Sequence, residues 1–489
     1  MNHFSACVGM ILGAGLLAGS DTAIAEVSGV NIGSRRELFV DRHLIDKLDG
    51  ASLQLHHPRP ADIALRFDRP YEGVFAGYTT VIKDGDTYRM YYRGLAAAAD
   101  GEANHSVGKE VTCYAESRDG IRWDKPNLGL FEINGNRDNN IVLAMTPACH
   151  NFCPFLDTRP GVEPAQRFKA VGGHGKAALL ALVSADGLHW KKLQDKPIFT
   201  KGAFDSQNLA FWSESENCYV CYFRAGKKIG NKAYRWISRT TSKDFLNWSE
   251  PVEMDFGDVP PEHFYTNQTG PYYRAPHLYV AVFARFNPGR QLIASADQAQ
   301  RLGIVGDYFS DTSDACFMTT RGGSHFDRTF MESFVRPGMG AANWVSRTNY
   351  PALGIVPTGE NEMSLYVQRH YAQPSHCLQR LTLRPDGFVS VHAPYSGAEM
   401  ITKPLVFSGK ELTINFATSA AGALQVEIQD AAGRAIPGFA LTDSTESFGD
   451  ELERVVTWKS GADASKLAGQ PVRLRFVMKD ADLYAIRFR

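Results

Sequence analysis

The segment SRDGIRW at residues 117–123 returns as SADGLHW at 184–190, and these copies decide how the chain is divided. A third copy, SKDFLNW at 242–248, lacks the glycine; TRGGSHF at 320–326 is a degraded fourth, and PDGF at 385–388 a candidate fifth. An Asp-Gly pair forms a tight turn between strands, the Ser and Asp side chains bond turn amides, and the aromatic residue packs between neighbouring sheets. The repeat therefore predicts a series of similar antiparallel sheets.

Short β-rich runs surround the copies, and each is bounded by Gly, Asp, Asn or Pro. Long amphipathic helical patterns are scarce. Because such sheets can bury their faces against one another in a ring, we predict a β-propeller of about five blades. Its inner strands are expected to start near Glu72, Asp157, Asp205, Glu262 and Asn343. The segment 37–41 is expected to close the ring by pairing with the last blade. The alternative is a β-sandwich with coincidental hairpin turns.

After Pro394 the pattern changes to alternating apolar and polar residues, for example at 410–416, 424–428 and 472–476. Alternation of this kind, interrupted by glycine-containing turns, indicates an antiparallel β-sandwich. The chain is thus expected to be all-β. We predict a signal peptide at 1–25, a five-bladed β-propeller at 26–395 and a C-terminal β-sandwich at 396–489.

The N-terminus has the pattern of a signal peptide. An apolar run from Ala6 to Ala18 precedes Ala23-Ile24-Ala25, a small-x-small motif that is cleaved before Glu26. The run is too short for a mature membrane-spanning helix. No Lys or Arg precedes it, and a disordered start is the alternative. The sequence therefore predicts a secreted or periplasmic protein without membrane insertion.

The charge is balanced, with 52 Lys and Arg against 53 Asp and Glu. No basic run is present, so no nucleic acid partner is expected. The sequence has no P-loop, no dinucleotide-type glycine turn and no His-Glu-x-x-His motif. Cys149 and Cys153 flank His150, but four ligands are not visible nearby in the sequence, so we predict no metal site there.

Several segments carry a resemblance to known proteins. They are ELFVD at 37–41, YRMYYRG at 88–94, FDSQN at 204–208 and VRLRF at 472–476, followed by Asp482-Leu483-Tyr484. With these segments the chain is similar, over nearly its whole mature length, to a group of secreted bacterial glycosidase-like proteins.

In architecture the pattern also resembles the five-bladed enzymes of glycoside hydrolase families 43 and 32, the second of which carries a C-terminal β-sandwich. The Asp-Pro signature of those families is absent near the first blade, as is the Arg-Asp-Pro signature of family 32. The resemblance implies hydrolysis of an extracellular poly- or oligosaccharide. It implies no required cofactor, with a structural Ca²⁺ ion as in some similar enzymes.

Glycoside hydrolysis usually needs two carboxyl groups that flank the scissile bond. Glu72, Asp157 and Asp205 stand at the predicted starts of three consecutive inner strands, which resembles the arrangement in the five-bladed glycosidases. Blade order would make Glu72 the base or nucleophile, Asp157 the orienting carboxylate and Asp205 the acid. The residue types at the first and third positions are swapped relative to those families, so the assignment of acid and base stays open. Each residue could instead cap a turn or pair with Arg.

Candidate substrate-binding residues lie beside these acids and in the later blades. They are His150, Asn208, Glu262, His263, Arg347, Asn349 and Trp344. An Arg in the tunnel favours a carboxylate or sulfate on the sugar, unless it forms a structural salt bridge. Aromatic faces can stack on sugar rings, and Tyr78, Trp212 and Trp344 are the candidate platforms. A non-catalytic carbohydrate-binding propeller is the alternative function, and the sequence leaves the oligomeric state undetermined.

Overall fold

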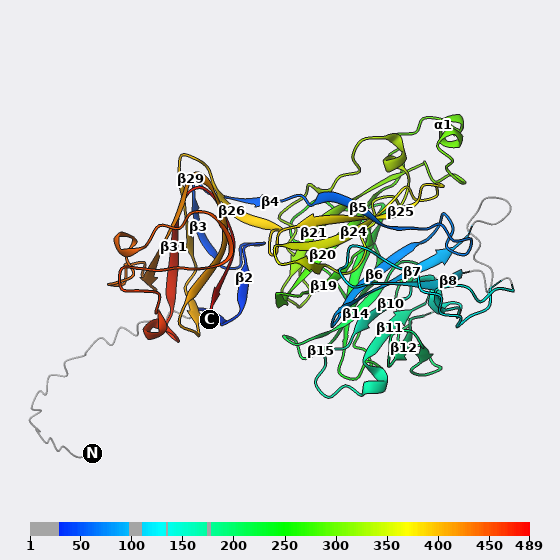
Figure 1. The fold of residues 1–489 in the computed structure, drawn as a ribbon, viewed down its shortest axis with the longest axis horizontal. Coiled ribbons are helices and arrows are strands. Elements are labelled where there is room, and N and C mark those ends of the chain that lie inside the picture. The colour runs from blue at the N-terminus through cyan, green and yellow to red at the C-terminus, as the bar shows by residue number, and fades with distance from the viewer. Residues whose placement is uncertain (1–28, 97–109, 134, 174–177) are drawn as a thin grey trace, which may run out of the picture.

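The computed structural model describes residues 29–96, 110–133, 135–173 and 178–489. The signal peptide predicted for 1–25 lies outside these ranges. Figure 1 shows two β-rich units beside each other, the larger one on the right and the smaller one, which carries the C-terminus, on the left. Within the described ranges the only α-helix is α1 (Ala296–Arg301). No described helix has the length and apolar character needed to cross a membrane.

Five sheets make up the larger unit, each antiparallel, which confirms the predicted five-bladed propeller. Blade one contains β6 (Gly77–Asp84), β7 (Thr87–Leu95), β8 (Glu110–Ser117) and β9 (Ile141–Leu143). Blade two contains β10 (Cys153–Leu156), β11 (Phe168–Gly172), β12 (Leu180–Ser184) and β13 (Lys191–Lys192). Blade three contains β14 (Leu209–Ser213), β15 (Cys218–Ile229), β16 (Lys232–Ser242) and β17 (Val252–Glu253).

Blade four contains β18 (Phe264–Thr266), β19 (Thr269–Tyr272), β20 (Ala275–Asn287), β21 (Thr312–Thr320) and β22 (Ser333–Val335). Blade five contains β23 (Val356–Gly359), β24 (Glu362–Arg369), β25 (Cys377–Leu383) and, from the N-terminal part of the chain, β5 (Arg59–Arg66). Short 3-10 helices lie in the connections: η1 (Ala148–His150), η2 (Pro164–Gln166), η3 (Ala341–Trp344), η4 (Leu441–Asp443) and η5 (Ser465–Leu467).

The ring is closed by β5, which pairs with β25, and not by the segment 37–41 as the sequence analysis expected. The strand in that segment, β2 (Arg36–Leu38), pairs instead with β31 (Val472–Phe488) of the smaller unit. The reason is burial: Leu38 and Val40 pack into the apolar cluster that joins the two units. The closure itself removes the free edge of the last blade, as expected for a ring.

The repeated segments form the turns that the sequence predicts. The hydroxyl oxygen of Ser117 accepts hydrogen bonds from the amides of Asp119 and Gly120, and Asp119 Oδ1 accepts from two later amides. Gly120 adopts a φ of 72°, which favours glycine. The Gly120 carbonyl accepts a hydrogen bond from the hydroxyl of Tyr366 in blade five. The turn therefore links neighbouring blades as well as neighbouring strands.

The smaller unit is built from both ends of the chain. Its ten-stranded sheet assembly contains β1 (Val30–Gly33), β2, β3 (Ile45–Asp49), β4 (Ser52–Leu55), β26 (Val389–Ala393), β27 (Ala398–Thr402), β28 (Leu405–Phe407), β29 (Leu412–Asp430), β30 (Asp450–Val455) and β31. It encloses an apolar core of its own. The sequence analysis placed the four N-terminal strands and β26 in the propeller, whereas the structure pairs them with the C-terminal strands.

Two buried glutamines tie the blades together at the axis of the ring. Gln207 Nε2 donates to Thr80 Oγ1 (2.9 Å) in blade one and approaches Cys153 Sγ (3.6 Å) in blade two. Gln268 Nε2, from blade four, donates to Gln207 Oε1 (2.6 Å) and to the carbonyl of Pro351 (2.8 Å) in blade five. This set, which we call the axial glutamine bridge, connects all five blades.

A cavity of about 620 Å³ lies between later residues of the inner strands, among them Phe155, Trp212 and Leu353. The axial glutamine bridge therefore lies between this mostly apolar cavity and the loops that precede the inner strands. Trp212 is buried in the core between blades, so this platform candidate does not lie on the loop side.

We predict that Gln207→Ala lowers the free energy of unfolding by about 1–3 kcal/mol, because it leaves buried partners without a hydrogen bond. Chemical denaturation followed by tryptophan fluorescence measures this change. Gln300→Ala, at an exposed position on α1, is the control. Equal midpoints for the two variants would contradict the role of the bridge.

Candidate active site at the ring entrance

One side chain from each blade stands at or just before the start of an inner strand. These are Tyr78, His150, Asp205, Tyr265 and Arg347, and we call the set the ring entrance. The rings of Tyr78 and His150 lie 6.0 Å apart, and the guanidinium of Arg347 lies 5.8 Å from the centre of the Tyr265 ring. The five blades thus converge on one cluster of polar and aromatic groups.

His150 lies between two carboxyl groups. Its Nδ1 is 2.8 Å from Glu110 Oε1, and its Nε2 is 3.1 Å from Asp205 Oδ1. Burial alone would lower the pKa of His150, but the hydrogen bonds to Asp205 and Glu110 outweigh it and raise the pKa above its usual value. When both ring nitrogens donate, the imidazole carries a positive charge.

Asp205 is held in its ionised form. The hydrogen bond from His150 holds the pKa of Asp205 far below its usual value against the opposing effect of burial, and the charges of Arg224 and Arg347 add to this. Arg224 lies 3.5 Å from the second carboxylate oxygen. The Asp205 side chain is nevertheless 54% exposed, so a ligand can reach it.

Asp311, which the sequence analysis did not single out, has the opposite electrostatic environment. It directly precedes β21, is partly buried, and its Oδ1 has no hydrogen-bond partner in the structure. Burial raises the pKa of Asp311 above its usual value even though Ser346, Arg347 and Arg235 act to lower it. Arg347 therefore acts on two carboxyl groups, one held ionised and one that keeps its proton to higher pH.

Three guanidinium groups lie near the ring of Tyr265. Their distances to the ring centre are 5.7 Å for Arg224, 5.1 Å for Arg235 and 5.8 Å for Arg347. Such distances permit cation–π attraction. Arg347 also contacts the ring of Tyr308 and donates to its hydroxyl at 3.3 Å. Among the described residues neither Arg235 nor Arg347 forms a close ion pair with a carboxylate, although both act on Asp311 at longer range and Arg347 also acts on Asp205.

Backbone strain is concentrated near the same cluster. Non-glycine residues with positive φ include Tyr78 (49°), Gln268 (45°), Arg347 (57°) and Asn349 (71°). Such conformations cost free energy and persist only where the surrounding structure fixes them. The side chains of Tyr78 and Arg347 are therefore held in place before any ligand arrives.

The structure does not bring Glu72 to the ring entrance. Its side chain is 0% exposed and accepts hydrogen bonds from Tyr92 (2.5 Å) and from Lys125 Nζ (2.7 Å) within blade one. The segment that contains it is a turn before β6, enclosed by the blade, and not the first residue of the inner strand. Its position fits a buried structural ion pair.

Asp157 also lies away from the ring entrance. It follows the last residue of β10 instead of opening the strand, so about 13 Å of extended chain separates it from the start of β10. Its side chain is 0% exposed and accepts from Lys169 (2.6 Å) and Tyr219 (2.7 Å). Of the three expected catalytic acids, only Asp205 is in the cluster.

Two side-chain amides predicted to bind substrate form hydrogen bonds to loop carbonyls instead. Asn208 is buried, and its Nδ2 donates to the carbonyls of Phe204 and Ser206, which fixes the loop that presents Asp205. Asn349 is also buried and donates to the carbonyls of Ser313 and Asn343 beside Arg347. Glu262 is held by Arg285 (2.9 Å) and Arg328 (3.0 Å).

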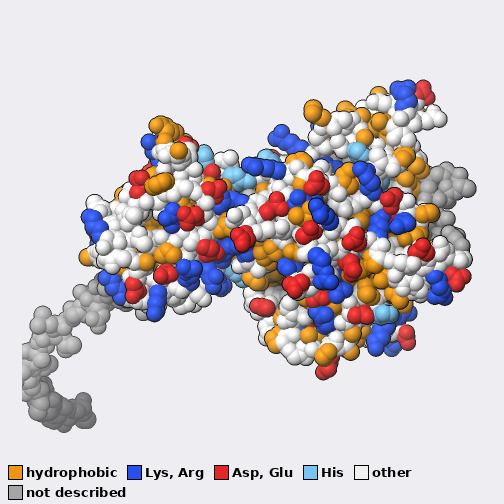
Figure 2. All heavy atoms as spheres, in the orientation of Figure 1, with side chains coloured by type: hydrophobic (Ala, Val, Ile, Leu, Met, Phe, Trp, Pro, Cys, Tyr) orange, Lys and Arg blue, Asp and Glu red, His pale blue; other side chains and the backbone are white. Residues whose placement is uncertain are grey.

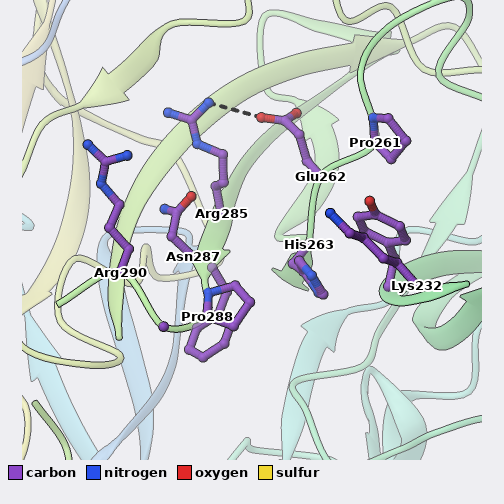
Figure 3. A pocket seen from close by; sticks show the side chains of 11 residues that line it. Lys232, Pro261, Glu262, His263, Arg285, Asn287, Pro288 and Arg290 are labelled. Carbon is purple, nitrogen blue, oxygen red and sulfur yellow. Dashed lines mark hydrogen bonds and ion pairs between the residues drawn. The ribbon is translucent and has the colours of Figure 1, made fainter. Parts of the chain in front are cut away.

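Figure 3 shows a pocket between blades three and four, lined in part by Glu262, His263, Arg285 and Arg290, with a volume of about 760 Å³. A second pocket of about 660 Å³ shares Arg285 and Arg290 and includes Trp344. Both pockets lie beside the ring entrance. His263 and Trp344 thus line open space, and their role in substrate binding stays a prediction.

No set of three or more His, Cys, Asp and Glu side chains suited to a metal ion is found in the described part of the chain. The structural Ca²⁺ ion implied by the resemblance stays a prediction. All seven cysteines of the described ranges are buried and unpaired in disulfides.

Comparisons with known proteins give a distant likeness. No family model matches the chain. An uncharacterized protein of Mycobacterium tuberculosis is 34% identical over 118 residues, or 24% of this chain. The chain spans about a third (33%) of the length of that relative.

Several solved structures resemble the chain at low sequence identity. A glycoside hydrolase shows 14% identity and a TM-score of 0.44 over 67% of this chain and 92% of its own. An N-acetylgalactosamine deacetylase from F. plautii is 12% identical, with a TM-score of 0.43, over 71% of this chain and 96% of its own. A fructofuranosidase from Schwanniomyces occidentalis is 11% identical, with a TM-score of 0.37, over 88% of this chain and 97% of its own. Identities this low concern the fold alone.

We predict that Asp205→Asn lowers the pKa of His150, because it removes one of the two carboxylates that stabilise the imidazolium. Titration of the His150 ring signals by NMR measures the shift. The matched control is Asp186→Asn, which removes the carboxylate 2.7 Å from the exposed His189 and should leave His150 unchanged. An unaltered His150 titration in Asp205→Asn would show that Asp205 does not act on this ring.

Proposed function

We propose that this protein is a secreted or periplasmic glycoside hydrolase that cleaves a poly- or oligosaccharide at the ring entrance. One observation carries the proposal: Asp205 and Asp311 both lie within the electrostatic reach of Arg347, yet their environments shift their pKa values in opposite directions. Hydrolysis of a glycosidic bond usually needs one ionised and one protonated carboxyl group, and the opposite shifts favour these two forms for Asp205 and Asp311.

The roles of the two groups follow from their protonation. Asp311, whose pKa is raised by burial, takes the role of the general acid that protonates the leaving glycosidic oxygen as the C–O bond breaks. Asp205 is ionised and acts either on the anomeric carbon as nucleophile or on the attacking water as base. Asp311 thus takes the role that blade order had given to Asp205.

His150 positions Asp205 in this scheme. Its Nε2 hydrogen bond fixes one oxygen of the carboxylate, while Glu110 holds the other face of the imidazole. Because the imidazolium stabilises the ionised form, Asp205 stays negative as positive charge develops on the sugar ring. That arrangement stabilises an oxocarbenium-like transition state.

A carbohydrate-binding protein without hydrolytic activity is the second candidate. The observation that favours it is the loss of two expected acids, since Glu72 and Asp157 are both held in buried ion pairs with lysine. In that case the ring entrance would bind the same sugar but transfer no proton. Activity measurements separate the two candidates.

We predict that Asp205→Asn and Asp311→Asn each reduce hydrolysis by at least about 100-fold, the usual contribution of a general acid or base. Screening a panel of polysaccharides for released reducing ends measures this loss. Asp258→Asn, an exposed loop position, is the matched control. Full hydrolysis by both variants would overturn the assignment, and wild-type binding without hydrolysis would favour the binding protein.

The pH dependence adds an independent check. The acid role requires protonated Asp311, so the rate should fall as the pH rises through the pKa of this group. Because burial raises that pKa, the fall should occur above the usual range of an Asp side chain. A rate that keeps rising over this range would contradict the acid role.

A further inference from the structure

Positive charge without a partner extends from the ring entrance across blade four. Lys232 lines the first pocket, Arg290 lines both pockets and Arg336 lines the second. All three side chains are exposed, and within the described ranges none of them forms an ion pair with a carboxylate. With Arg235 and Arg347 they make five cations that form no close ion pair, which we call the cationic track.

The acidic groups of these pockets are already neutralised. Glu262 is held by Arg285, as Figure 3 shows, and also by Arg328. Asp314 is held by Arg285 at 2.6 Å. These two acids and two arginines balance one another. A ligand in the pockets would therefore meet a net positive charge, which comes from the cations of the track.

Side-chain contacts connect the linings of the two pockets with the ring entrance. Phe286 lines the first pocket, lies 5.5 Å from the ring of Tyr265 and receives the guanidinium of Arg235 at 4.4 Å. On the other side, Trp344 lines the second pocket and stands three residues before Arg347 in the same loop. The pockets and the ring entrance are therefore neighbours in the fold.

We propose that the ring entrance and the two blade-four pockets form one groove for an acidic glycan, a chain whose sugars carry carboxylate or sulfate groups. This proposal rests on the proposed function and names its substrate class. Arg347 takes the anionic group of the sugar at the ring entrance, and Lys232, Arg290 and Arg336 take those of the following sugars.

Arginine suits this role because its planar fork can donate two parallel hydrogen bonds to a carboxylate or sulfate. A neutral sugar placed over Arg347 would bury an unpaired charge, which costs free energy. The carboxyl groups nearby do not oppose an anion strongly, since Asp205 is paired with His150 and Arg224 and burial favours the protonated form of Asp311. The entrance therefore selects against neutral sugars as well as for acidic ones.

Binding of defined polysaccharides to the Asp205→Asn protein tests the substrate class without hydrolysis of the probe. Polygalacturonate and a sulfated galactan are compared with their carboxyl-reduced and desulfated forms by isothermal titration calorimetry. We expect the acidic form of at least one pair to bind about tenfold or more tightly, the size of one charge-assisted hydrogen bond. The difference should shrink at high salt. The pair that responds identifies carboxylate or sulfate as the recognised group.

The triple variant Lys232→Ala, Arg290→Ala, Arg336→Ala tests the track itself. It should weaken binding of the acidic form and leave that of the neutral form unchanged. The matched control is Lys191→Ala, Lys192→Ala, Lys196→Ala, which removes the same charge from exposed positions on blade two. Arg347→Gln should abolish the preference between acidic and neutral forms, and Arg347→Lys should restore part of it.

Equal affinity for the acidic and neutral forms, or an equal effect of the two triple variants, would overturn the proposal. Either result leaves the proposed hydrolysis untouched if the wild type still cleaves a neutral glycan. Conversely, a preference for the acidic form in a protein that cleaves nothing would support the groove and refute the hydrolase.

Discussion

The arrangement of the whole ring depends on the amide groups of Gln207 and Gln268 at its axis. The inner strands are short, with four residues in β10 and three in β18, so few backbone hydrogen bonds hold them within each blade. The axial glutamine bridge adds contacts between blades, and it does so in a buried place where each polar atom needs a partner. The five residues of the ring entrance start from this fixed frame.

The smaller unit holds the first and last segments of the chain together. Its interface with the propeller combines an apolar cluster with ion pairs, among them Arg321 with Glu37 (2.8 Å) and Arg36 with Asp386 (3.2 Å). Burial would raise the pKa of Glu37, but His277 and Arg321 outweigh it and lower the pKa to about 2. The chain enters β5 directly after β4, so anchoring β4 in the smaller unit also positions the strand that closes the ring.

Local chemistry explains which parts of the fold were predictable. The Ser-x-Asp-Gly turns depend on hydrogen bonds within a few residues, so the sequence alone predicts them and the blades they divide. Strand ends are different, because they depend on pairing partners far away in the chain. The sequence analysis therefore treated Asp157 as the start of a strand that in fact ends at Leu156. The assignment of 37–41 to ring closure failed for the same reason.

In the candidate site, too, features set by neighbouring residues could be predicted from the sequence, and features set by distant segments could not. Asp205 could be found because its polar neighbours in the run 204–208 precede a buried strand. Asp311 could not, because its raised pKa arises from burial among loops that meet only in the folded chain. Arg347 acts to lower the pKa of both carboxyl groups. Only Asp205 also accepts a hydrogen bond from an imidazole, which keeps it ionised against the effect of burial. The difference between the two acids is thus produced by His150, whose position is fixed by Glu110 in the neighbouring blade.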